Sequence, residues 1–158
     1  MVDLWPDKFN QTGALKTPAG ILREQGRRLA AKTQNIITAG IEAAFLPRRI
    51  VKEKYGADEG LFMYDFYLEA PVLDYYRYNL LTIFHGISFY PLIINTDEVV
   101  KEELTGNIAN LTAGNQEEFL GLLERILNSN RTLTIIESVL AQAKEIVSPN
   151  STYQQEDP

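Results

Sequence analysis

His85 is the only histidine in the chain, and the chain has no cysteine, so few side chains could act as catalysts. A general base needs a nucleophile or a substrate proton within hydrogen-bond reach. Ser88 lies three residues after His85, and that spacing across a predicted turn does not make a catalytic triad. We expect His85 to end a strand and to hydrogen bond with the backbone. The sequence therefore predicts no catalytic residues and favours a non-enzymatic protein.

Metal and cofactor chemistry have little support in the sequence. One histidine without any cysteine cannot form the usual nitrogen and sulfur ligand sets. Carboxylates could still hold Mg²⁺ or Ca²⁺. Asp65 and Glu69, however, lie four residues apart on a predicted strand, about 13 Å along it, which is too far to share an ion. The sequence contains no GxxxxGK[ST], GxGxxG or GxSxG motif. We expect no metal and no cofactor.

Basic and aromatic side chains are the remaining candidates for binding a ligand. Arg23 and Arg27 belong to a basic stripe on the first predicted helix, which could hold an anionic group. The alternative is a solvated helix face. Tyr67 lies in a tyrosine-rich segment that could stack a ring-bearing ligand, although tyrosines also fill cores and sheet edges. Arg77 and His85 would add contacts to an anion. The predicted ligand-binding residues are Arg23, Arg27, Tyr67, Arg77 and His85.

Residues 61–96 must position three of these side chains, and their pattern predicts the central sheet. Between Leu61 and Glu69, apolar or aromatic residues alternate with residues of a second, more mixed set. That alternation is typical of a strand with unequal faces. A turn around Pro71 follows, and a second alternating run begins at Tyr76. We therefore expect an antiparallel hairpin.

Charge pairing suggests the register of this hairpin. Glu69 opposite Arg77 brings opposite charges together, and it places Asp65 opposite Leu81. The aromatic residues of both strands then gather on one face. The other face is mixed and carries Met63, Tyr67, Leu81, Ile83 and Ile87. It is too apolar to face water, so we expect the first helix to cover it; the N-terminal arm and a homodimer are the alternatives.

Three further segments allow more than one interpretation. Gly86 marks a hairpin turn, which we favour, or a bulge in one long strand. Pro91 then places its strand at a sheet edge or at a bulge. Asn35–Leu46 alternates like a strand, although its alanines also suit a helix, and its small residues would let another element approach closely. We expect Arg48–Tyr55 to be a short strand.

Helical patterns flank the sheet. Thr17 can cap a helix that begins at Pro18, and Asn115 with Glu118 resembles a capping box. The expected helices cover residues 17–32, 96–104, 115–127 and 131–147. The last two should form an αα-hairpin over the aromatic face. The sequence thus predicts a single α+β domain over residues 17–148: an antiparallel sheet of about four strands, with one N-terminal helix and two or three C-terminal helices packed on it.

The ends of the chain differ from this domain. Residues 1–16 form an irregular N-terminal arm, in which Leu4, Trp5 and Phe9 are apolar enough to dock on the body. The alternative is a partner-binding hook around Trp5, the only tryptophan. Residues 149–158 form a polar C-terminal tail that we expect to fray.

Composition narrows the class of function. At 158 residues the chain suits one domain, and a net charge of −6 argues against nucleic-acid binding, which needs phosphate neutralisation. The lack of cysteine, of a leader pattern and of any long apolar run leads us to expect a cytoplasmic protein without a membrane span.

Two hypotheses of function follow. The first is a non-enzymatic, acidic interaction protein of the inhibitor, immunity, anti-defence or regulatory-subunit type, which binds a protein partner. The second is a small-ligand binding domain or unrecognised enzyme, which holds an anionic or ring-bearing ligand with its tyrosines and arginines.

Overall fold

The computed structural model describes residues 1–9, 16–55 and 60–147, which form an α+β domain with a five-stranded antiparallel sheet. The expected fold class is confirmed, with one strand more than the predicted four. In chain order the elements are α1 (Pro18–Lys32), β1 (Thr38–Leu46), α2 (Arg48–Tyr55), β2 (Leu61–Ala70), the short 3-10 helix η1 (Pro71–Leu73), β3 (Tyr76–His85), β4 (Leu92–Thr96), α3 (Glu98–Thr105), β5 (Leu111–Ala113), α4 (Gln116–Leu127) and α5 (Asn130–Val147).

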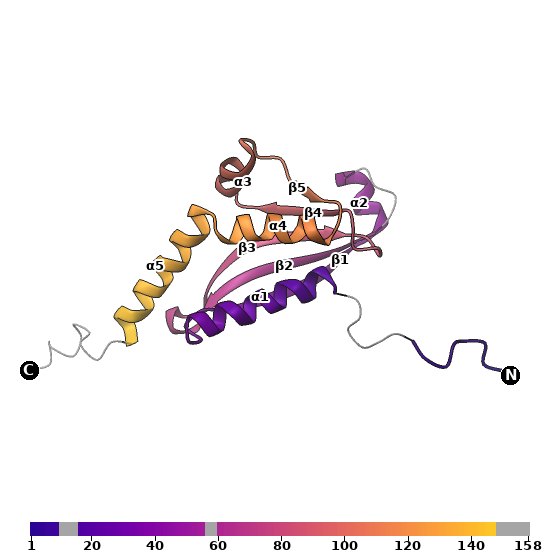
Figure 1. The fold of residues 1–158 in the computed structure, drawn as a ribbon, viewed down its shortest axis with the longest axis horizontal. Helices are drawn as coiled ribbons and strands as arrows, with labels where there is room; N and C mark the ends of the chain where they lie inside the picture. Colours follow the sequence, from indigo (N-terminus) through magenta and orange to yellow (C-terminus); the bar gives the residue numbers. More distant parts are fainter. Residues whose placement is uncertain (10–15, 56–59, 148–158) are drawn as a thin grey trace, which may run out of the picture.

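The strands lie in sequence order, β1-β2-β3-β4-β5, and each pairs antiparallel with the next. Helices α1, α4 and α5 cover one face of this sheet (Figure 1). We call this the helix-covered face and the opposite one the open face. The prediction that the first helix covers the mixed face is wrong, because α1 packs on the same side as α4 and α5. The predicted αα-hairpin does not form either, since α5 runs away from the end of α4 instead of returning alongside it (Figure 1).

The register of the β2–β3 hairpin matches the prediction near its turn and departs from it beyond a bulge. Glu69 pairs with Arg77 as expected, but Asp65 pairs with Thr82, because the register shifts between Phe66 and Tyr67. The shift turns the rest of β3 over, so the aliphatic side chains predicted for the mixed face enter the main core instead. Burying one such side chain contributes roughly 1.5–3 kcal/mol, which exceeds the roughly 1 kcal/mol of one lost ladder hydrogen bond.

Helix α2 replaces the strand predicted for Arg48–Tyr55. Its first turn forms a hydrogen bond from the Val51 N–H to the Pro47 carbonyl oxygen. Val51 is fully buried and packs with Leu61 and Phe84 over one end of the open face. A single buried residue among charged neighbours is enough for a short helix, whereas a strand would need several apolar residues on alternate positions.

Other segments resolve the remaining alternatives. Asn35–Leu46 contains strand β1 and no helix, and Gly86 begins a loop between β3 and β4, which supports the turn interpretation. Pro91 lies outside β4, and β4 pairs with both β3 and β5, so the predicted edge position is wrong. Strand β5 lies between the helices predicted for residues 96–104 and 115–127, and it is the strand that the sequence did not predict.

Helix ends and chain ends complete the fold. The Thr17 hydroxyl accepts a hydrogen bond from the Gly20 N–H, and the Asn115 side chain accepts one from Glu118, so both predicted caps are confirmed. In the described part of the arm, residues 1–9, the Trp5 side chain is 74% exposed, so the prediction that it docks on the body is wrong. The predicted tail, residues 149–158, lies outside the described residues.

Candidate functional site

Strand β1 is an edge strand whose outer backbone has no strand partner within the described residues. It is nine residues long, and its second half is exposed. Along an edge strand, alternate N–H and C=O groups point away from the sheet, and proteins commonly protect such edges with lysine, proline or a covering element. β1 contains neither lysine nor proline, and Glu42 is its only charged residue. Its backbone is therefore available for pairing.

On the helix-covered face, a groove of about 350 Å³ runs between α1 and the first half of β1. We call it the edge groove. Gly26 allows the two elements to approach closely, since a Cβ there would lie 3.0 Å from the Ala39 Cβ. Its lining residues are Arg23, Gly26, Arg27, Ala30, Thr38, Ala39, Gly40, Ile41 and Phe66.

Two arginines give the edge groove its charge. Arg23 and Arg27 are both exposed on α1. The Arg27 guanidinium pairs with Glu24 at 2.7 Å. Arg23 has no ion pair with any residue that the structure describes. This arginine pair, Arg23 and Arg27, therefore leaves positive charge beside the edge strand.

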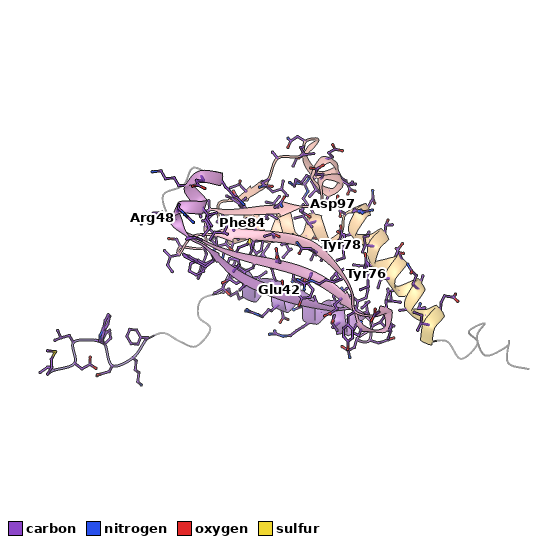
Figure 2. All side chains as sticks on the ribbon, turned by 180° about the vertical axis from the view of Figure 1, so that it is seen from behind. Glu42, Arg48, Tyr76, Tyr78, Phe84 and Asp97 are labelled. Carbon is purple, nitrogen blue, oxygen red and sulfur yellow. The ribbon has the colours of Figure 1, made fainter. Side chains whose placement is uncertain are left out.

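On the open face, a chain of contacts crosses from β3 to β1. The Arg77 guanidinium carbon lies 3.5 Å from the centroid of the Tyr67 ring, and its Nη1 donates a 2.8 Å hydrogen bond to Glu42. Tyr67 lies over Gly40 so closely that a Cβ at that position would overlap the ring. Figure 2 shows the sheet from behind, with Glu42 on its strands. We call Tyr67 and Arg77 the tyrosine–arginine stack.

The charge of Arg77 in this stack also affects the pKa of Glu42 on the edge strand. The hydrogen bond from Arg77, together with its charge, lowers the pKa of Glu42 below its ordinary value. The same hydrogen bond raises the pKa of Arg77. Glu42, the only charged residue of the edge strand, is thus already neutralised by a neighbour of its own chain.

The structure brings four of the five predicted ligand-binding residues to the two sides of β1. Arg23 and Arg27 lie on the helix-covered side, and Tyr67 and Arg77 lie on the open side. His85 does not join them, because it ends β3, eight residues after Arg77 and roughly 26 Å along the strand. Whether these residues bind a ligand stays a prediction.

His85 has the environment of a core residue. It is 3% exposed, its Nδ1 lies 2.8 Å from the Gly86 carbonyl oxygen, and its ring stacks on Tyr64. Its Nε2 is buried without a hydrogen-bond partner among the described residues. The expected backbone hydrogen bond is therefore present.

Two residues of the candidate site, Gly40 and Glu42, were not predicted from the sequence. Both lie on β1, and their contacts with Tyr67 and Arg77 depend on the pairing of β1 with β2. The available signal was the set of small residues in this segment, which predicted a close approach by another element: Ala39, Gly40, Ala43 and Ala44. The approach by α1 at Gly26 confirms that expectation.

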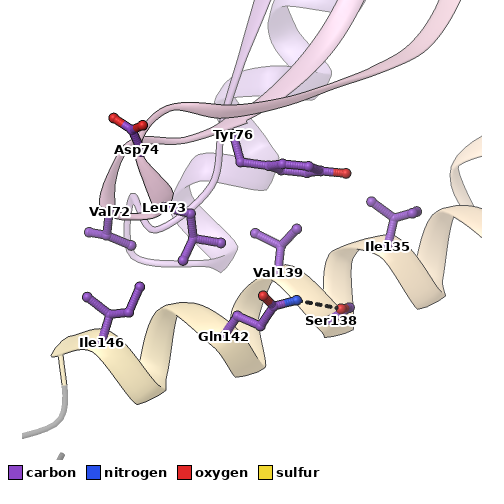
Figure 3. A pocket seen from close by; sticks show the side chains of 9 residues that line it. All are labelled: Val72, Leu73, Asp74, Tyr76, Ile135, Ser138, Val139, Gln142 and Ile146. Carbon is purple, nitrogen blue, oxygen red and sulfur yellow. Dashed lines mark hydrogen bonds between the residues drawn. The ribbon is translucent and has the colours of Figure 1, made fainter. Parts of the chain in front are cut away.

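A second cavity, of about 490 Å³, lies between η1 and α5 (Figure 3). Its walls are mostly aliphatic, and the Gln142 side chain donates a 3.1 Å hydrogen bond to Ser138 beside it. Asp74 is the only charged residue that lines it. A carboxylate at the rim repels an anion, so this cavity does not suit the anionic ligand predicted from the sequence. Its lining residues are Val72, Leu73, Asp74, Tyr76, Ile135, Ser138, Val139, Gln142 and Ile146.

A polar cluster links β3 to two helices. The Tyr78 hydroxyl donates to Asp97, the N-cap of α3, at 3.2 Å, and Arg131 of α5 approaches the same carboxylate at 3.5 Å. Burial, together with the Asp97 charge, raises the pKa of Tyr78. Each of these three side chains already interacts with another of them, so the cluster holds α3 and α5 against the sheet.

Of the helices in residues 16–55 and 60–147, none has both the length and the apolar character needed to cross a membrane. Within the same part of the chain, no three histidine, aspartate or glutamate side chains gather closely enough to hold a metal ion. No protein-family model matches the sequence, and comparison with curated proteins and with solved structures finds no match.

Proposed function

We propose that this chain is a non-enzymatic interaction protein, which binds a protein partner through the outer edge of β1. The observation that carries the proposal is the nine-residue edge strand, whose outer backbone has no strand partner within the described residues and which lies between the arginine pair and the tyrosine–arginine stack. Inhibitor, immunity, anti-defence and regulatory-subunit roles all fit this proposal, because each requires contact with a protein partner. The lack of cysteine favours a cytoplasmic setting.

Backbone pairing favours a protein partner over a small molecule. An added strand satisfies alternating N–H and C=O groups along the whole edge, and each hydrogen bond contributes roughly 0.5–1.5 kcal/mol. A small molecule would satisfy only one or two of these groups. The edge groove is also open and lined by exposed arginines, whereas ligand pockets usually enclose most of the ligand.

Proline substitutions can test the role of the edge without knowledge of the partner. N–H groups alternate in direction along a strand, so one of Ala43→Pro and Ala44→Pro removes an outward donor and the other removes a donor to β2. Ala43 and Ala44 are both exposed, so the outward variant should keep the fold. Valine at the same position retains the N–H and serves as the matched control.

The experiment is a pull-down from lysate of the host, with wild type, the folded proline variant and its valine control as baits. The proposal expects a protein, identified by mass spectrometry, that wild type and the valine control retain and the proline variant loses. Identical captures by all three baits, or no specific capture by any, would contradict it.

A small-ligand role is the second candidate, and the cavity between η1 and α5 is the observation that favours it. Its volume of about 490 Å³ lies within the range of ordinary ligand sites. The aliphatic walls and Asp74 suit an apolar ligand with a neutral or cationic polar group. Native mass spectrometry of protein purified from the host would show a bound small molecule, and replacing Val139 by tryptophan (Val139→Trp) should remove it.

A further inference from the structure

We infer that the partner contributes an extended acidic segment, which pairs with β1 as a sixth strand between the arginine pair and the tyrosine–arginine stack. This inference rests on the function proposed above and specifies the chemistry of the partner. A strand that joins a sheet lies about 4.8 Å from its neighbour. Beside β1, that position runs along the edge groove, where α1 forms one wall.

The spacing of the arginine pair matches that of an added strand. Arg23 and Arg27 are four residues apart on a helix, so they lie about 6 Å apart along its axis and on one side. Residues two apart on a strand point to the same face and lie about 6.8 Å apart. Acidic residues at alternate positions of the segment can therefore reach both guanidinium groups at once.

The charges already present beside the groove favour acidic residues on this face. Arg23 has no acidic partner among the described residues, and Arg27 shares Glu24 with Arg28. On the helix-covered face, the side chains of β1 near the groove are those of Ala39 and Ile41, which offer no carboxylate. A carboxylate from the partner would supply the missing charge.

The open face calls for different residues at the intervening positions of the segment. Tyr67 lies over Gly40 and places a phenol next to the edge, and its hydroxyl has no hydrogen-bond partner in the described part of the chain. Arg77 is already paired with Glu42. Neutral side chains that form hydrogen bonds, such as threonine, fit this face without disrupting that ion pair.

A second copy of the chain does not meet these requirements through β1. A two-fold pairing of β1 with itself would direct alanine, isoleucine and phenylalanine side chains toward the arginine pair, and no carboxylate. The described part of the arm fits no better. Asp3 and Asp7 lie four residues apart, about 13 Å on a strand, and Pro6 between them lacks an N–H.

The test uses synthetic peptides and purified full-length chain. A fluorescein-labelled peptide that alternates glutamate and threonine should bind, as measured by fluorescence anisotropy, and its affinity should fall as salt rises. A peptide with glutamine for glutamate tests the charge. A peptide of the same composition, with all glutamates before all threonines, tests the spacing. The inference expects both control peptides to bind more weakly.

Variants on α1 locate the binding site. Replacing the arginine pair, Arg23→Glu with Arg27→Glu, should weaken binding of the alternating peptide by about five-fold or more, because two exposed ion pairs are lost. Arg28→Glu is the matched control, since Arg28 lies on the same helix and shares Glu24 but does not line the edge groove. Circular dichroism should show all three proteins folded, as these side chains are exposed.

Each outcome decides the inference. Equal affinity for the glutamate and glutamine peptides, equal loss in the paired variant and in Arg28→Glu, or no binding at all would overturn it. If the chain dimerises and the proline variant of β1 does not, then β1 pairs with a second copy of the chain and not with an acidic segment, which would also overturn the inference. A host protein that is lost with the proline variant, but retained by the Arg23→Glu and Arg27→Glu chain, would leave the proposed function standing and refute only the acidic partner.

Discussion

Two neighbouring proline substitutions should have very different effects on stability if the outer edge of β1 is free. Ala43 and Ala44 are adjacent, both are exposed, and they pair with Tyr64 and Met63 of β2. The N–H of one donates to β2, and the N–H of the other points away from the sheet. Proline at the position whose N–H donates to β2 removes a ladder hydrogen bond and leaves a β2 carbonyl oxygen without a donor. Proline at the neighbouring position removes only a donor that points away from the sheet.

The magnitude follows from these two losses. A lost ladder hydrogen bond with an unsatisfied partner costs about 1–3 kcal/mol, which corresponds to a fall in Tm of about 2–12 °C for a domain of this size. The outward variant should lie within about 0.5 kcal/mol of its valine control. Urea unfolding followed by far-ultraviolet circular dichroism is the suitable assay. Tryptophan fluorescence is not, since Trp5 lies exposed in the arm.

The test does not require knowing in advance which of Ala43 and Ala44 donates to β2, because the prediction concerns the difference in stability between the two proline variants. Equal destabilisation of both, by 1 kcal/mol or more on the scale of one ladder hydrogen bond, would mean that both edges of β1 are paired. It would thereby refute the free edge from which the proposed function is argued.

Three other predictions concern the site and the core. Gly40→Ala should destabilise the chain by about 1–3 kcal/mol in urea unfolding, since the new methyl group overlaps Tyr67. Adding Tyr67→Ala should recover part of this loss. Purely additive effects of the two substitutions would contradict the contact between Gly40 and Tyr67. Arg77 lowers the pKa of Glu42, so the pair stabilises the fold above the ordinary carboxyl pKa of 4.5 and this contribution is lost as pH falls through the lowered value. Tm measured from pH 7 to pH 2 should therefore fall more steeply for wild type than for Arg77→Ala, and parallel curves would show that the ion pair does not form in solution. Ile83→Ala should lower the free energy of unfolding by about 2–5 kcal/mol in the same assay, because the side chain is fully buried. A change near zero would mean that Ile83 lies on the open face and not in the core.

Local patterns in the sequence were sufficient to predict β1, β2, β3 and the hairpin near its turn, but they missed β5 and wrongly predicted a strand at Arg48–Tyr55. Alternation identified β2 and β3, and the opposite charges of Glu69 and Arg77 gave their pairing correctly. These signals act between neighbours in sequence or across a tight connection. They extend only as far as the register remains regular, which is why Asp65 was assigned to the wrong partner.

The bulge could not be predicted, because it is a response to the whole core. Leu81 and Ile83 are 1% and 0% exposed, among side chains from α4 and β4 that come later in the chain. Only with those elements in place does it become favourable to turn β3 over. The same reason applies to α2, whose Val51 packs in a cluster with residues of four different strands.

The residue types of the candidate site were predicted from the sequence, but their places in the fold were not. Whether its arginines and its tyrosine bind a ligand stays a prediction, and no local pattern connected Arg23 with Tyr67. The edge strand connects them, since each lies beside a different face of β1. His85 was grouped with them because histidine is chemically versatile, and its burial under aromatic rings depends on contacts between distant segments.

Backbone amide hydrogen exchange along Thr38–Leu46, measured by NMR, tests the free edge of β1 and its occupation together. In the chain alone, protected and rapidly exchanging amides should alternate, because every second N–H faces solvent. Addition of the peptide that alternates glutamate and threonine should slow the rapidly exchanging set, and should leave the exchange of α5 unchanged. Uniform protection before the peptide is added, or an unchanged alternation after it, would contradict the account.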